Sequence, residues 1–168
     1  SAEYMSGLRE FGAKIDFDFS LNSRHQMKFG ASSTYHNFFP SEMQLNTTGY
    51  NRFSSFSDDI KAYNQFIYIE DEINVNQRLK LNLGLHLALF SVQQKNYVKL
   101  QPRLLGRYLI NEKWSLKFSY AEMQQNLHLL TNSSAGLPTD IWVPATDSVP
   151  PQQSKQVTFS INTNIMDG

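Results

Sequence analysis

Six leucines at every second position between residues 79 and 89 constrain the fold of this chain more than any other feature. They are Leu79, Leu81, Leu83, Leu85, Leu87 and Leu89, and the residues between them are polar or small. A helix would spread these leucines around its circumference, whereas a strand places all of them on one face. The segment is therefore predicted to be a β-strand with one apolar face.

The same alternation recurs along the chain. Apolar and polar residues alternate in four further segments, at 15–21, 27–35, 114–120 and 157–161. Two more strands, with a less regular phase, are predicted at about 62–75 and 100–110. Asp71 falls on the apolar side of its strand, and a β-bulge would explain that position. Together these segments predict an all-β fold, an antiparallel meander sheet of about seven long strands.

The predicted connections fall into two classes. Three are short polar turns that begin with asparagine, at 22–24, 76–78 and 111–113. The others are longer, at about 38–60, 92–98 and 127–153. Short and long links alternate, so all the short turns lie at one end of the sheet, as in transmembrane β-barrels. Strands of roughly 11–14 residues are also long enough for a tilted membrane crossing, which needs about 9–11.

The composition fits a sheet with one lipid-facing and one wet side. Charged residues make up only 18% of the chain, against about 25% in an average soluble protein, while aromatic residues reach 13%. The net charge is zero and no basic run occurs, which argues against nucleic acid as a partner. The absence of cysteine excludes disulfides, thiolate metal sites and a cysteine nucleophile.

Two segments resemble the repeated hairpin of TonB-dependent outer-membrane receptors. Residues 66–72 read Phe-Ile-Tyr-Ile-Glu-Asp-Glu, and residues 79–85 read Leu-Lys-Leu-Asn-Leu-Gly-Leu. The family repeats an aromatic-rich strand with an acidic end, a short turn, and a strand of the form L-x-L-N-x-G-L-R. His86 stands where the family usually has arginine. Residues 101–125 are similar to the next hairpin, and residues 127–144 resemble a loop of the branch with a carboxypeptidase-regulatory-like leader domain.

The resemblance implies a function as well as a fold. Members of the family are 22-stranded barrels with an internal plug that import siderophores, vitamins or glycans. Residues 1–168 are then expected to be a single β-barrel segment of a larger chain, with no plug domain, in the outer membrane of a Gram-negative cell. The implied partners are outer-membrane lipid, a nutrient ligand, a surface lipoprotein, and the TonB energy-coupling complex through regions outside this chain. A secreted soluble β-sheet module that binds carbohydrate or protein stays open as the alternative.

The sequence contains no arrangement that is typical of catalysis. The four histidines are not at a metal-ligand spacing and are expected to be solvated, and no G-x-S-x-G motif occurs. We therefore expect no enzyme activity, no metal and no cofactor. Glu70, Asp71 and Glu72 could bind a cation, but an ion pair between this strand and a cross-strand lysine or arginine is favoured.

Aromatic residues in the long connections are the candidate ligand-binding residues. Tyr50 and Phe53 lie in the 38–60 connection, and Trp142 lies in the 127–153 connection. Aromatic rings offer a large contact area for a sugar or an apolar ligand at a low entropy cost. The alternative is that these rings anchor the loops or form an interfacial girdle. Four prolines in 127–153 predict a rigid, extended excursion over the sheet.

Overall fold

The computed structural model describes most of the chain as β-strand. Residues 1, 48–49, 56–58, 133–138 and 164–168 are not described, nor are the side chains of 2–6, 40–47, 50–55, 130–132 and 139–141. The strands are β1 (Ala2–Ser20), β2 (His25–Thr47), β3 (Tyr50–Ser55), β4 (Ile60–Asn74), β5 (Leu79–Val92), β6 (Lys95–Leu109), β7 (Trp114–Gln125), β8 (Leu127–Asn132), β9 (Thr139–Pro144) and β10 (Gln152–Thr163). No helix in the described part is long and apolar enough to cross a membrane.

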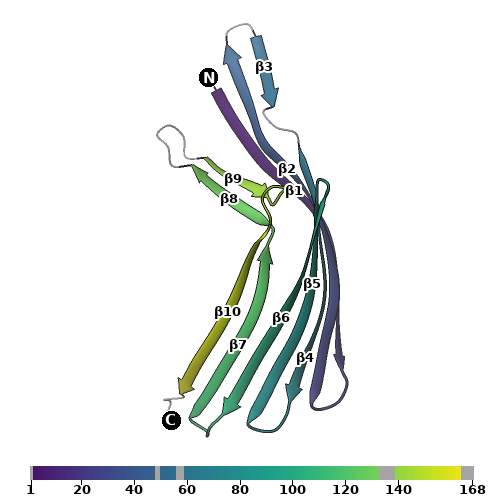
Figure 1. Ribbon diagram of the computed structural model, residues 1–168, viewed down its shortest axis with the longest axis vertical. Helices are drawn as coiled ribbons and strands as arrows, with labels where there is room; N and C mark the ends of the chain where they lie inside the picture. Colours follow the sequence, from purple (N-terminus) through teal and green to yellow (C-terminus); the bar gives the residue numbers. More distant parts are fainter. Residues whose placement is uncertain (1, 48–49, 56–58, 133–138, 164–168) are drawn as a thin grey trace.

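Seven long strands form one curved antiparallel sheet in the order β1-β2-β4-β5-β6-β7-β10. Each long strand pairs with the next one, so the predicted meander is confirmed. The short strand β3 pairs with the far end of β2, and β8 and β9 form a separate hairpin (Figure 1). In the described part of the chain β1 and β10 are the two edges of the sheet, which therefore does not close into a barrel.

The short turns owe their shape to asparagine. Asn76 Oδ1 accepts hydrogen bonds from the backbone N–H groups of Arg78 and Leu79, both at 2.8 Å. Asparagine favours such turns because its side chain can take the place of a backbone acceptor. The other two turns repeat these bonds, from Arg24 and His25 to Asn22 and from Lys113 and Trp114 to Asn111. All three turns lie at the same end of the sheet (Figure 1).

The long connections contain more strand than the sequence predicts. The expected 92–98 loop is wrong, because β5 and β6 meet in a two-residue turn at Gln93 and Gln94. Gln93 has a positive φ of 53°, which lets the turn follow the twist of the paired strands. The predicted 38–60 loop is largely a hairpin, since β2 extends to Thr47 and returns as β3.

The pairing register places apolar residues of the neighbouring strands on the same face as the leucines of β5. Leu85 pairs with Ile69 on β4 and with Pro102 on β6. We call this side the apolar face and the opposite side the polar face. Every long strand exposes at least one large apolar side chain on the apolar face: Phe17, Phe29, Ile69, Leu85, Leu100, Phe118 and Phe159.

Asp71 lies on the apolar face without a bulge. The ladders of β4 with β2 and with β5 are continuous past this residue, so the predicted bulge is wrong. Asp71 instead forms a hydrogen bond with His25, whose Nδ1 lies 2.7 Å from Asp71 Oδ2. The imidazole beside it offsets the cost of holding a carboxylate among apolar side chains.

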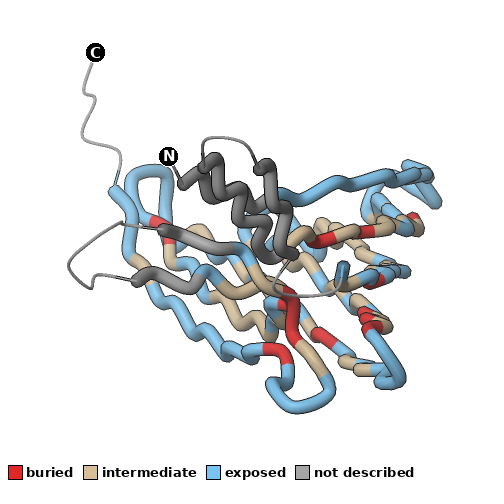
Figure 2. The backbone as a smooth tube through the Cα atoms, turned by 90° about the horizontal axis from the view of Figure 1, so that it is seen from above, coloured by how far each residue is buried: buried red, intermediate tan, exposed pale blue. Residues whose placement is uncertain are grey.

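A small core lies on the polar face at the end of the long connections. It consists of Phe38, Ala62, Phe90, Val92 and Ala145, all nearly inaccessible to solvent. Ala145 comes from the predicted 127–153 loop, in which the extended strands β8 and β9 form a hairpin. Seen from above, the edge strands β1 and β10 are exposed along most of their described length, and burial is confined to the inner strands and to this loop (Figure 2).

Candidate functional site

The β8–β9 hairpin has an exposed pair of apolar residues. It lies at the end of the sheet where the predicted long connections are found, which we call the long-loop end; the asparagine turns are at the opposite, short-turn end. Trp142 pairs with Leu129 across the hairpin, so the two side chains lie on the same face. Trp142 is 50% exposed and Leu129 is 44% exposed. Directly paired residues stand about 5 Å apart, so together they form one continuous apolar surface.

The base of the hairpin is fixed to the sheet by core packing and hydrogen bonds. Leu127 packs against the core, two pairs along the hairpin from Leu129. The Asn126 amide donates to Asn64 Oδ1 of β4 at 3.0 Å, and Tyr97 Oη donates to the Thr146 carbonyl at 2.6 Å. The backbone of β9 also lies against β1 and β2, so the hairpin crosses from the β7 side to the other edge (Figure 1). Trp142 is therefore carried on a rigid base.

Tyr50 and Phe53, the other two candidates, lie on β3. They pair with Thr47 and Gln44 of β2, and their side chains lie outside the described residues. The β3 hairpin and the β8–β9 hairpin both occupy the long-loop end of the sheet (Figure 1). The structure thus brings all three candidates to one end, on two separate hairpins.

A row of paired residues crosses the polar face below the hairpins, and all of them except Gly30 carry polar side chains. Asp16, Gly30, Tyr68, His86 and Gln101 follow one another in register from β1 to β6. Tyr68 Oη donates to Asp16 Oδ1 at 2.5 Å, and the Tyr68 and His86 rings stack with centroids 5.1 Å apart. These contacts link β4 to its neighbour β5 and, across β2, to β1.

Histidine–acid pairs replace the predicted charge pairing on this face. Glu70 does not meet a lysine or arginine as expected, because its Oε1 lies 2.8 Å from His86 Nε2. His36, expected to be solvated, is only 6% exposed and lies 2.8 Å from Glu10. Within the described residues, no group of three or more His, Cys, Asp or Glu side chains could hold a metal ion.

A charged cluster lies where β6 and β7 separate. Their ladder ends at Arg103 and Ala121. Just beyond it, Glu122 lies 2.9 Å from Lys99 of β6 and 3.5 Å from Lys155 of β10. The cluster links three strands at the level where backbone hydrogen bonds between β6 and β7 stop. The β8–β9 hairpin begins directly after β7, beyond this cluster.

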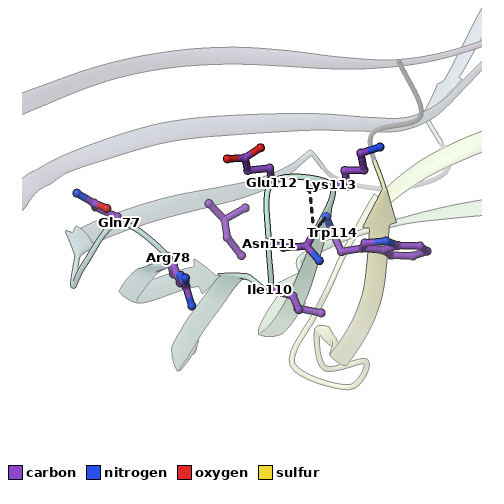
Figure 3. A pocket seen from close by; sticks show the side chains of 8 residues that line it. Gln77, Arg78, Ile110, Asn111, Glu112, Lys113 and Trp114 are labelled. Carbon is purple, nitrogen blue, oxygen red and sulfur yellow. Dashed lines mark hydrogen bonds between the residues drawn. The ribbon is translucent and has the colours of Figure 1, made fainter. Parts of the chain in front are cut away.

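A second surface feature lies at the opposite, short-turn end. A hollow of about 680 Å³ lies between the turn at 76–78 and the turn at 111–113. Its lining includes Arg78, Ile110 and Trp114, which Figure 3 shows around the two turns. The sequence does not predict this hollow, because the asparagine motifs indicate where the turns lie but not how neighbouring turns pack.

Comparison with known proteins shows which family and which solved structures the chain resembles. The sequence matches the family described as TonB dependent receptor-like, beta-barrel, over residues 1–167. No curated protein sequence matches. Two similar solved structures are the FpvAI–pyocin S2 complex and the ferripyoverdine receptor of the outer membrane of Pseudomonas aeruginosa bound to ferripyoverdine. Each has a TM-score of 0.61 and 16% identity over 99% of this chain. The chain spans only 25% and 24% of those two chains, respectively.

Proposed function

The chain belongs to the TonB-dependent receptor β-barrel family, and from that premise we propose that it forms part of the wall of a receptor that imports a nutrient across the outer membrane. Family membership implies an outer-membrane location, in a Gram-negative cell. The receptor as a whole would bind and pass its ligand rather than transform it. Residues 1–168 would contribute a barrel segment without a plug, and the TonB complex would act through other regions of the protein.

The observation that carries this proposal is the two-sided sheet. The apolar face is continuous over all seven long strands, and the polar face holds the Asp16–Tyr68 and Glu70–His86 contacts. In a transmembrane barrel the first side meets lipid and the second lines the interior. A tilted crossing needs about 9–11 residues, so β2, with 23 residues, reaches well beyond the hydrocarbon layer at the long-loop end.

We assign ligand contact to the long-loop end. Trp142 with Leu129 offers an apolar platform on a rigid base, and Tyr50 and Phe53 on β3 are proposed as further contacts. A siderophore or a glycan fits such a surface, because both present rings or apolar edges to an aromatic side chain. The likeness to the ferripyoverdine receptor, which was solved with ferripyoverdine bound, supports the siderophore class.

The sequence of the β8–β9 hairpin supports two further proposals, one on the branch of the family and one on a protein partner. The resemblance of residues 127–144 to a loop of the branch with a carboxypeptidase-regulatory-like leader domain supports membership of that branch. A surface lipoprotein would then dock at the same end as the β8–β9 hairpin. The encoded precursor tests the branch directly, since its N-terminal region would contain the leader domain.

The function is tested on the full-length receptor in its own cells. A deletion strain and a complemented strain are compared for uptake of labelled ferric siderophores and labelled oligosaccharides, with a strain that lacks the TonB complex as the control. We expect the receptor in the outer-membrane fraction and ligand uptake that requires both the receptor and TonB. Recovery of the receptor in the soluble fraction would instead support the secreted binding module.

A further inference from the structure

Two arginines at the short-turn end occupy equivalent places. Arg24 and Arg78 are each the third residue of an asparagine turn. The Arg24 carbonyl accepts a hydrogen bond from Asn74 N at 2.7 Å, and the Arg78 carbonyl accepts one from Leu109 N at 2.8 Å. Each turn is thereby joined to the end of the next hairpin in the sheet. The same arrangement thus occurs twice, about 10 Å apart, which is the spacing of two strands.

Each arginine stands beside an exposed apolar residue. Val75 follows Asn74 and is 40% exposed, and Ile110 follows Leu109 and is 45% exposed. Ile110 continues the even-numbered positions of β6 that lie on the apolar face. Figure 3 shows the Arg78 and Ile110 side chains on the same side of the turns, with Glu112 and Lys113 on the other.

Among the residues that the structure describes, no side chain neutralises either guanidinium group. Over the part of the chain that the structure describes, neither Arg24 nor Arg78 forms a side-chain hydrogen bond or ion pair, and both residues are exposed. The hollow between the second and third turns lies directly beside Arg78. A guanidinium has a planar set of donors that binds a phosphate through two parallel hydrogen bonds.

We propose that Arg24 and Arg78 each bind the phosphate of a phospholipid headgroup, whose acyl chains lie along Val75 and Ile110. The proposal rests on the proposed function, since it requires the apolar face to lie in the outer membrane. Apolar residues directly beside an unpaired arginine match a ligand with a charged phosphate and a hydrocarbon tail. Inorganic phosphate would make no use of Val75 or Ile110.

The site is tested on the full-length receptor in vesicles that contain phosphatidylglycerol with a photoreactive group near the start of one acyl chain. After illumination, labelled peptides that contain Val75 or Ile110 are quantified by mass spectrometry. We expect both peptides to be labelled. Arg78→Gln should lower labelling of the Ile110 peptide about fivefold, the effect of one cation near an anionic headgroup. Arg24→Gln should leave the Ile110 peptide unchanged and lower labelling of the Val75 peptide.

Lys80→Gln and Lys117→Gln are the matched controls, because both residues carry the same charge near the same end but lie on the polar face. They should leave labelling of both peptides unchanged. Labelling that is insensitive to Arg78→Gln, or equally sensitive to Lys80→Gln, would overturn the proposal. Loss of labelling in millimolar inorganic phosphate would also overturn it, because free phosphate would then be the preferred ligand.

Failure of this site is distinguishable from failure of the proposed function. The wild type and each variant are first located by membrane fractionation and assayed for ligand uptake. A receptor that resides in the outer membrane and imports ligand, yet shows no Arg78-dependent labelling, contradicts the lipid site alone. A wild-type receptor that is absent from the outer membrane contradicts the proposed function itself.

Discussion

The Tyr68 hydroxyl donates a 2.5 Å hydrogen bond to Asp16, although β2 lies between their strands. Gly30 of β2 makes this possible, because it pairs with Asp16 on one side and with Tyr68 on the other. A Cβ at position 30 would lie 2.6 Å from Asp16 Oδ1 and 2.7 Å from Tyr68 Cε1. The bond across β2 therefore requires a residue without a side chain at position 30.

Replacement of Gly30 tests this close approach. Gly30→Ala should lower the free energy of unfolding by about 1–3 kcal/mol, since the added methyl group must displace Tyr68 or the β1 backbone. The measurement is denaturant unfolding of the full-length receptor in detergent, followed by tryptophan fluorescence.

Gly106→Ala is the matched control for Gly30→Ala. At position 106 the nearest neighbour of an added Cβ is Leu81 Cδ2 at 3.4 Å, which is close to ordinary contact. We expect this variant to be as stable as the wild type or slightly more stable, because alanine loses less backbone entropy than glycine. Equal losses in both variants would mean that the row from Asp16 to Tyr68 imposes no special constraint.

The asparagine turns and the alternation predict most of the sheet, and the same rules could have predicted more. The turn at 22–24 places Ser20 opposite Gln26, and counting outward from that pair places Glu10 opposite His36. The prediction of solvated histidines failed because it treated each histidine by itself. Glu70 and His86 likewise come within reach once the turn at 76–78 sets the register of β4 and β5.

Other features depend on contacts that no local pattern encodes. The turn between β5 and β6 has neither glycine nor asparagine at its centre, so nothing in the sequence marks it as a two-residue turn. The place of Trp142 depends on how β9 lies against β1 and β2, which are more than ninety residues earlier in the chain. Long-range packing of this kind sets a side chain's exposure without leaving a period in the sequence.

The core at the long-loop end should control the position of the β8–β9 hairpin. Phe90 is fully buried in the cluster that contains Ala145. Phe90→Ala should lower the free energy that holds the core together by about 3–5 kcal/mol. Residues 126–151 should then be released from the sheet. We expect proteases added to intact cells to cleave this segment faster, while the barrel remains folded.

Leu87→Ala is the control for Phe90→Ala. Leu87 is on the same strand but points to the apolar face, away from the hairpin. It should leave the cleavage rate of the hairpin unchanged. If Phe90→Ala also leaves that rate unchanged, the core does not fix the hairpin.

The turn between β5 and β6 stores backbone strain that a substitution should relieve. Gln93 is the residue with positive φ, at 53°, a region that glycine enters without steric cost. Gln93→Gly should raise the free energy of unfolding by about 0.5–1 kcal/mol, measured as above. Gln94→Gly should give no gain, because position 94 does not need a positive φ. A loss of stability in Gln93→Gly would show that the contact from Asp147 N to Gln93 Oε1 outweighs the strain.

Trp142 provides the most direct test of where ligand binds. Its ring is half exposed beside Leu129, while the base of the same hairpin is held by the core and by the bond from Asn126 to Asn64. The side chain can thus be removed without disturbing the contacts that hold the hairpin. A structural anchor would instead be buried, as Leu127 is in part.

Trp142→Ala in the full-length receptor should weaken ligand binding about tenfold or more, a typical loss for an aromatic side chain that is covered in a complex. Ligand affinity is measured by titration on purified receptor, and uptake is measured in cells with equal amounts of folded receptor. Trp114→Ala is the matched control, because Trp114 is 45% exposed but lies at the short-turn end, far along the strands from the outer hairpins. If Trp142→Ala has normal affinity and uptake, the Trp142 ring only packs within the loop and does not contact the ligand. A failure of the receptor to assemble would assign Trp142 a structural role, and the binding surface would then have to be sought on β3.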